Sequence, residues 1–87
     1  MIEIVVHDHA LKHGLTREEI EFAWRGFICQ RHRRTPHSDQ VVTVGVTQEG
    51  AIVEMVAVER GNELLIYHAL TPPTKSVLRE LGLVRRQ

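Results

Sequence analysis

Six histidines stand out among the residues of this 87-residue chain that could do chemistry: His7, His9, His13, His32, His37 and His68. The imidazole ring exchanges protons near pH 7, so these side chains are the first candidates for general acids and bases. Three segments hold them, and each segment also carries other polar groups that could act on a substrate.

The first segment, from His7 to His13, also contains Asp8 and Lys12. If the segment is helical, His9 and His13 lie on one face, four residues apart. Asp8 and Lys12 form a second pair of the same spacing. One interpretation is a cationic surface, on which the histidines exchange protons and the lysine binds a phosphate. The alternative is a solvated helix face with a modest charge pair.

The same segment is also a candidate metal site. His7, His9 and His13 offer three imidazoles and Asp8 a carboxylate, which are ligands that zinc accepts. The chain has no His-Glu-x-x-His motif, and its single cysteine, Cys29, lies elsewhere. We therefore expect neither a metal nor another cofactor, and keep a small His-based metal-binding protein as an alternative.

The second segment is rich in arginine. Arg31, Arg33 and Arg34 fall within four positions, with His37 close behind. The planar guanidinium group suits phosphate, and loops often carry function, so this segment is a candidate for phosphate or RNA binding. The alternative is a solvent-exposed loop without a ligand, whose positive charge is partly neutralised by the acidic residues at positions 18, 19 and 21.

The third segment contains Tyr67 and His68 near the end of a β-branched and apolar run. Strict alternation along a strand predicts that His68 shares a face with Leu64 and Ile66, while Tyr67 takes the other face. Such a histidine is either a core residue with a satisfied hydrogen bond or, at the end of a strand, a general acid or base.

The size and composition of the chain limit the class of protein. Eighty-seven residues form one domain, 1–87, and the 43% of apolar and 25% of charged residues are typical of a globular protein. The 11 basic and 11 acidic residues balance, so any contact with nucleic acid must come from local clusters. The apolar stretches are too short for a membrane span. The start of the chain lacks the features of a signal peptide. A single cysteine cannot form an internal disulfide, which suits a reducing compartment. We expect a cytoplasmic protein with no membrane contact.

The patterning predicts seven elements. Thr16 and Glu19 form a capping box that begins an amphipathic helix. Three later strands, separated by short glycine-containing turns, indicate an antiparallel meander. Residues 30–40 and 83–87 are expected to be a loop and a tail. The expected elements are strand 2–6, helices 8–13 and 17–29, strands 41–46, 51–59 and 63–70, and a helix capped by Thr71 and ended by Gly82.

The expected fold class is therefore α+β, in the order β-α-α-β-β-β-α. An antiparallel sheet with its helices on one face would form two layers, which buries the apolar stripes of both. The strands at 41–46 and 51–59 carry few charges, so an exposed edge would favour pairing with another chain, such as a second copy in a homodimer.

One stretch of the chain resembles a known family. The residues from His9 to Ile20, which contain Lys12-His13-Gly14, are similar to the Lys-His-Gly segment near the N-terminus of BrnT-type toxins. This family belongs to the RelE/ParE-like group of bacterial toxin–antitoxin systems. The later meander and the closing helix also resemble that fold. At the last strand, where the family tends to carry an Ile-Ser-Ala-Arg type of segment, this chain has Tyr67-His68-Ala69-Leu70.

The resemblance implies a type II toxin, a small metal-independent endoribonuclease that cleaves mRNA and is inhibited by a cognate antitoxin. Lys12 and His13 fall on the Lys-His pair of the family. RNA brings its own nucleophile, the 2′-hydroxyl group, so the protein must supply a base, an acid and cations. We expect His13 and His68 to be the base and acid, and Tyr67, beside His68, to be a further catalytic residue. Lys12 and one of the three arginines would stabilise the developing charge.

Two alternatives remain beside the nuclease. A non-catalytic module of the same fold would bind a partner through its strand edges and the helix that carries Trp24. A metal-binding protein would use His7, His9 and His13. The nuclease hypothesis requires Lys12 and His13 to meet Tyr67 and His68 over one pocket.

Overall fold

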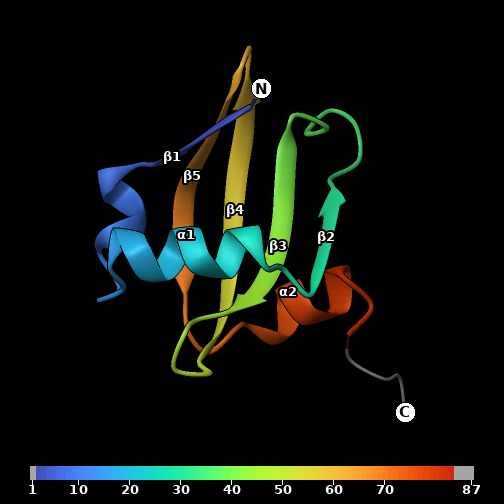
Figure 1. Cartoon of the computed structure of the whole chain (residues 1–87). Coiled ribbons are helices and arrows are strands. Elements are labelled where there is room, and N and C mark those ends of the chain that lie inside the picture. Colours follow the sequence, from blue (N-terminus) through green and yellow to red (C-terminus); the bar gives the residue numbers. More distant parts are fainter. Residues whose placement is uncertain (1, 84–87) are drawn as a thin grey trace.

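The computed structural model describes residues 2–83, which form a five-stranded sheet with two α-helices and one short 3-10 helix (Figure 1). The mixed α+β class is confirmed. Residues 84–87 of the predicted tail lie outside the described residues. The elements are β1 (Glu3–Val6), the 3-10 helix η1 (Asp8–Leu11), α1 (Arg17–Arg25), β2 (Cys29–His32), β3 (Gln40–Val46), β4 (Ile52–Arg60), β5 (Glu63–Leu70) and α2 (Lys75–Glu80).

The predicted order of elements is wrong by one strand. The helix that was expected to continue to Cys29 ends at Arg25, since Gly26 is its C-cap. The chain then turns into the sheet, where the backbone N–H of Ile28 donates to the carbonyl of Val44, and β2 follows in place of the start of the predicted loop. Three of the four residues of β2 are polar, and a polar strand is stable here because it forms an edge of the sheet.

The sheet is mixed rather than purely antiparallel. Its strands run in the order β1-β5-β4-β3-β2, and the pairs from β2 to β5 are antiparallel. The pairs β3–β4 and β4–β5 confirm the predicted three-strand meander. β1 instead lies parallel to β5, because the chain leaves β1 through η1 and α1 and enters the sheet again at its far edge. Figure 1 shows α1 crossing the sheet between these two edges.

Helices cover both faces of the sheet, so the prediction of helices on one face is wrong. Ile20, Ala23 and Trp24 of α1 belong to the main core together with one face of β3, β4 and β5. Val77 and Leu81, in and just after α2, pack on Val42 and Val44 of the opposite face. The physical reason is that β3 is apolar on both sides, so each side has to be shielded from water.

The backbone of α1 lies very close to β3. A methyl group placed on Gly45 would lie 2.0 Å from the carbonyl oxygen of Ala23. Only a residue without a side chain fits between the helix and the strand, which explains a glycine in the interior of a buried strand. This contact fixes the height of α1 above the sheet.

Local signals at the ends of the helices are partly confirmed. The capping box of α1 is present, since the Thr16 hydroxyl accepts from Glu19 N–H and the Glu19 carboxylate accepts from Thr16 N–H. The N-cap of η1 is His7, not Asp8, because the His7 ring accepts from the His9 N–H. The N-cap of α2 is Thr74, three residues after the predicted Thr71. In residues 2–83, neither helix has the length and apolar composition needed to cross a membrane.

Candidate functional site

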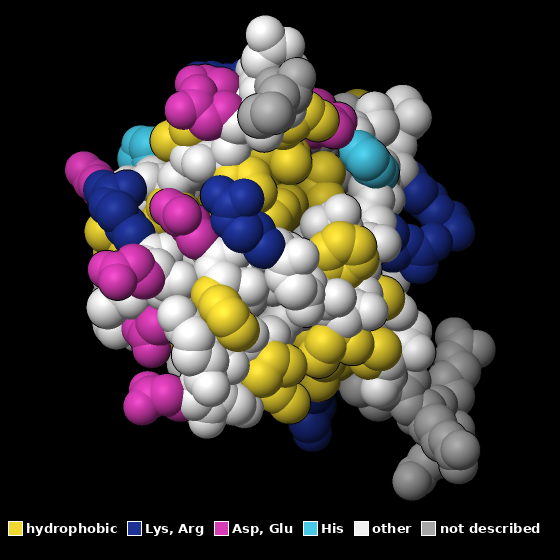
Figure 2. All heavy atoms as spheres, viewed as in Figure 1, with side chains coloured by type: hydrophobic (Ala, Val, Ile, Leu, Met, Phe, Trp, Pro, Cys, Tyr) yellow, Lys and Arg dark blue, Asp and Glu magenta, His cyan; other side chains and the backbone are white. Residues whose placement is uncertain are grey.

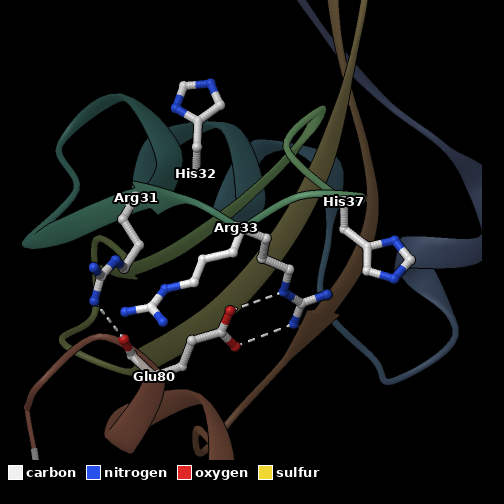
Figure 3. A pocket seen from close by; sticks show the side chains of 6 residues that line it. Arg31, His32, Arg33, His37 and Glu80 are labelled. Carbon is white, nitrogen blue, oxygen red and sulfur yellow. Dashed lines mark hydrogen bonds and ion pairs between the residues drawn. The ribbon is translucent and has the colours of Figure 1, made fainter.

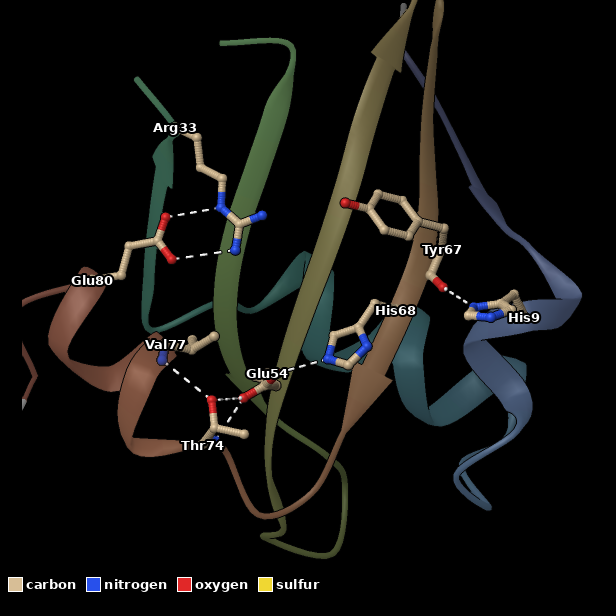
Figure 4. A network of polar contacts seen from close by, with 8 residues as sticks. All are labelled: His9, Arg33, Glu54, Tyr67, His68, Thr74, Val77 and Glu80. Carbon is tan, nitrogen blue, oxygen red and sulfur yellow. Dashed lines mark hydrogen bonds and ion pairs between the residues drawn. The ribbon is translucent and has the colours of Figure 1, made fainter. Parts of the chain in front are cut away.

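The candidate site lies on the face of the sheet that carries α2, which we call the α2 face. A register shift between β4 and β5 pairs Val56 with His68 and Ala57 with Ile66, so Tyr67 has no partner on β4. This β-bulge breaks the alternation of side chains. Ile66 and Ala69 both belong to the core beneath α1, and Tyr67 and His68 both lie over the α2 face (Figure 4).

This arrangement corrects the prediction for the third segment. His68 was expected to share a face with Leu64 and Ile66, but those two residues pack on the α1 side and His68 faces the other way. The alternation of a regular strand could not place it, because the bulge adds one residue between Ile66 and His68. Tyr67 and His68 are thereby brought to the same surface.

His68 is held by a buried carboxylate. Its Nε2 atom lies 2.7 Å from Oε2 of Glu54, whose side chain projects from β4 and is only 4% exposed. The other carboxylate oxygen, Oε1, accepts two hydrogen bonds from Thr74, at 2.6 Å from the backbone N–H and 2.9 Å from the hydroxyl. Glu54 therefore joins His68 to the start of α2 (Figure 4).

The hydrogen bonds keep Glu54 ionised. Burial alone raises the pKa of the Glu54 carboxyl, but the hydrogen bonds from Thr74 and His68 outweigh it, and the resulting pKa lies below the ordinary value. A buried carboxylate of this kind is a hydrogen-bond acceptor only.

This lowered pKa predicts a loss of stability in acid. Because the folded-state pKa of Glu54 lies below that of the unfolded chain, its contribution is complete above about pH 4.3 and is lost as the pH falls through the folded value. We expect the free energy of unfolding, measured in urea between pH 7 and pH 3, to fall more steeply in the wild type than in Glu54→Gln. Parallel curves for the two proteins would contradict this prediction.

His13 lies beside His68. The centres of the two rings are 6.0 Å apart, and the rings meet edge to face at 76°. β1 ends level with Ile66, and beyond this point η1 lies along β5, where Nδ1 of His9 is 3.1 Å from the carbonyl oxygen of Tyr67. Two segments that are 55 positions apart in sequence therefore meet at His13 and His68, which is one of the contacts that the nuclease hypothesis requires. The catalytic roles of these residues stay a prediction.

The first segment does not form the two predicted pairs. It is a 3-10 helix that ends at Leu11, so four-residue spacing does not align its side chains. Lys12 lies near His9 instead, with Nζ 3.4 Å from Nε2 of that ring. Asp8 is paired with Arg17 rather than with Lys12. Within residues 2–83 no three potential metal ligands gather at one point, so the geometry gives no support to the metal alternative.

The arginines line a shallow hollow of about 410 Å³ beside the C-terminal end of α2, which we call the arginine hollow (Figure 3). Arg33 is bound through Nε and Nη2 to the Glu80 carboxylate, at 2.9 and 3.3 Å, and through Nη1 to Gln40. Arg31 donates to the carbonyl oxygen of Glu80. The lining residues are Arg31, His32, Arg33, Arg34, His37 and Glu80.

Glu80 binds two of the three arginines that were predicted to bind phosphate, Arg31 and Arg33. Its hydrogen bond is the largest cause of the raised pKa of Arg33, whose charge is therefore permanent but partly neutralised. The sequence suggested that acidic residues at positions 18, 19 and 21 would neutralise the arginines. The carboxylate that binds Arg33 instead comes from Glu80 in α2. Arg34 and His37 are exposed at the rim. His32 borders the hollow, but its ring points away from Arg31 and Arg33 (Figure 3) and pairs with Glu59 at 3.1 Å.

The arginine hollow and His68 lie on one face of the sheet. Figure 4 shows Arg33, Tyr67 and His68 over the same face of the sheet, with the hydroxyl group of Tyr67 directed towards Arg33. Tyr67 and Glu54 also contribute to the raised pKa of Arg33. The α2 face thus combines arginines, a phenol and the imidazole of His68, and the His13 ring lies beside that imidazole.

Sequence reasoning missed Glu54, Thr74 and Glu80. One signal was available for Glu54, since it is the single acidic residue inside the apolar run from Ala51 to Val58. A charge in such a run is almost never buried unless it is paired. Comparison of the chain with protein-family models, curated protein sequences and solved structures gives no significant match.

Proposed function

We propose that this protein is a metal-independent endoribonuclease and the toxin component of a bacterial type II toxin–antitoxin system. The observation that carries the proposal is the pair formed by His13 and His68, whose ring centres lie 6.0 Å apart, together with Arg33 on the same face of the sheet as His68. Two imidazoles at this spacing can reach one phosphodiester group together.

The chemistry requires little more than this pair. One imidazole removes the proton of the 2′-hydroxyl group, and the other gives a proton to the departing 5′-oxygen. Each proton transfer by a positioned group accelerates a reaction by about 10²–10⁴-fold. No step in this scheme needs a metal ion.

Cations on the same surface would hold the RNA backbone and stabilise the charge that develops on the phosphate. Arg34 lies exposed at the rim of the arginine hollow, and Lys12 is exposed directly before His13. Arg31 and Arg33 are already bound to Glu80. They therefore contribute positive electrostatic potential, while their hydrogen-bond donors are largely occupied. Neighbouring phosphates of one strand would contact the two ends of this surface.

The resemblance of Lys12-His13-Gly14 and the later meander to BrnT-type toxins of the RelE/ParE-like group supports the toxin assignment. The same resemblance supports a cognate antitoxin as the protein partner and the cytoplasm as the compartment. RNA is then the substrate. The strands whose edges favoured a homodimer, β3 and β4, lie inside the sheet, so a homodimer would have to pair through β1 or β2 instead.

The test is cleavage of RNA by the purified wild-type protein in the presence of EDTA. We expect a labelled single-stranded RNA, or mRNA in a translating extract, to be cut, and inducible expression in bacteria to arrest growth. Co-expression of a small neighbouring gene should relieve the arrest. RNA that stays intact in both assays, together with normal growth, would contradict the proposal.

A second candidate, a protein-interaction module, is favoured by a separate observation. Phe22, Phe27 and Ile28 are 50%, 48% and 56% exposed at the end of α1 and just after it. Figure 2 shows hydrophobic side chains gathered on the face that carries α1. This surface is distinct from the α2 face, so a partner bound there would leave the histidine pair accessible. A Phe27→Ser variant that still cleaves RNA but no longer binds the antitoxin would separate the two functions.

A further inference from the structure

The carboxylate of Glu54 has three hydrogen-bond donors around it, and their arrangement determines what His68 must contribute. Oε1 already accepts from the backbone N–H and the hydroxyl of Thr74. That hydroxyl also accepts from the N–H of Val77, so its own hydrogen is directed at Glu54. Oε2 is left for Nε2 of His68, at 2.7 Å.

This arrangement fixes the tautomer of the ring. An ionised carboxylate can only accept, so Nε2 of His68 has to carry a hydrogen. In the neutral ring the lone pair is then on Nδ1, which is the nitrogen that does not face Glu54. The side chain is 28% exposed, so the ring is accessible to a ligand on the α2 face.

The ring of His13 differs from that of His68 in its contacts with carboxylates. Among residues 2–83, carboxylates contact the rings of His32 and His68, and none contacts His13, which is exposed. The two imidazoles are therefore unequal, since one is oriented by a buried anion and the other is exposed to solvent.

From these contacts we propose that Glu54 is a positioning residue that makes His68 the general base and leaves His13 as the general acid. The inference rests on the proposed function. Nδ1 of His68 takes the proton of the 2′-hydroxyl group, and the 2′-oxygen forms a bond to phosphorus. The bond between phosphorus and the 5′-oxygen breaks, and His13 in its imidazolium form gives that oxygen a proton. The products are a 2′,3′-cyclic phosphate and a 5′-hydroxyl group.

The variant Glu54→Gln separates positioning from folding. The two donors of Thr74 require the amide oxygen of the glutamine to take the place of Oε1. The amide NH₂ group then faces His68 and donates to Nε2, which must lose its hydrogen. The hydrogen moves to Nδ1, so the variant keeps the contact with α2 but blocks the nitrogen that acts as the base.

Two measurements on the full chain test the inference. Nitrogen-15 NMR of the neutral His68 ring should show the hydrogen on Nε2 in the wild type and on Nδ1 in Glu54→Gln. The kcat for RNA cleavage should fall by about 10²-fold or more in the variant, with KM changed by less than about threefold. Glu54→Asp keeps an anionic acceptor and should retain the wild-type tautomer and part of the activity.

Glu59→Gln is the matched control. It makes the same substitution on the same strand and removes a carboxylate from another imidazole, that of His32, away from the histidine pair. We expect the His68 spectrum and the cleavage rate to be those of the wild type.

The outcomes are distinct. A wild-type ring with its hydrogen on Nδ1, or Glu54→Gln with the reversed tautomer and an undiminished kcat, would overturn the inference. A wild-type protein that does not cleave RNA would overturn the proposed function instead. The ring spectra need no RNA, so they would still confirm or reject the orientation of His68 by Glu54.

Discussion

Replacing either His68 or His13 by alanine should lower the rate of RNA cleavage by about 10²–10⁴-fold, because each change removes one of the two proton transfers. The two rings lie 6.0 Å apart and act on the same phosphodiester group in this account. The double variant should therefore lose less than the product of the two single losses, as expected for groups that act as a unit. The measurement is the rate of cleavage of a labelled RNA under single-turnover conditions.

The histidine variants need controls for folding. Removal of the His68 ring leaves the buried Glu54 carboxylate with one donor fewer, so part of any loss could come from a disturbed α2. In His68→Gln the amide group can again donate to the Glu54 carboxylate, but it cannot act as a base. This variant should be as inactive as His68→Ala. His32→Ala removes an exposed imidazole whose ring points away from Arg31 and Arg33 and pairs with Glu59, so this variant should cleave at the wild-type rate. Wild-type rates in both His68→Ala and His13→Ala would contradict the assignment.

Gly45→Ala should destabilise the fold by about 3 kcal/mol or more, which is the upper end for overpacking a core. The new methyl group would lie 2.0 Å from the carbonyl oxygen of Ala23, and neither backbone can move without separating α1 from β3. Urea unfolding followed by circular dichroism measures the effect.

Gly26→Ala is the matched control for this prediction. The nearest atom to its new methyl group would be the carbonyl oxygen of Phe22, at 3.7 Å, which is ordinary contact. Its stability should stay within about 1 kcal/mol of the wild type. Equal unfolding midpoints for Gly45→Ala and the wild type would show that α1 does not lie on β3 as described.

Local sequence signals predicted much of the fold. The capping box at Thr16 and Glu19, the β-branched runs and the turn glycines depend on neighbours in the chain, and the structure confirms the helix start and the three-strand meander. The polar strand β2 escaped prediction because its stability comes from pairing with β3, not from its own residues. The position of α2 on the second face likewise depends on Val42 and Val44, which are distant in sequence.

The candidate site was predicted only in part, for a similar reason. The imidazoles and arginines could be recognised by residue type, and His13 and His68 do meet. The face taken by His68 depends on a bulge that the alternation pattern does not encode. The partners Glu54 and Glu80 are joined to His68 and Arg33 by hydrogen bonds across the fold, so neither pairing has a signature in the local sequence.

The most direct test of the account is the chemistry of the products formed from RNA in EDTA. A substrate with a single 2′-deoxyribose at the cleaved position removes the nucleophile that the histidine pair is proposed to activate. The account predicts a 2′,3′-cyclic phosphate and a 5′-hydroxyl end from the all-ribose substrate, and no cleavage at the deoxy position. Cleavage at the deoxy position with an undiminished rate would contradict the central claim.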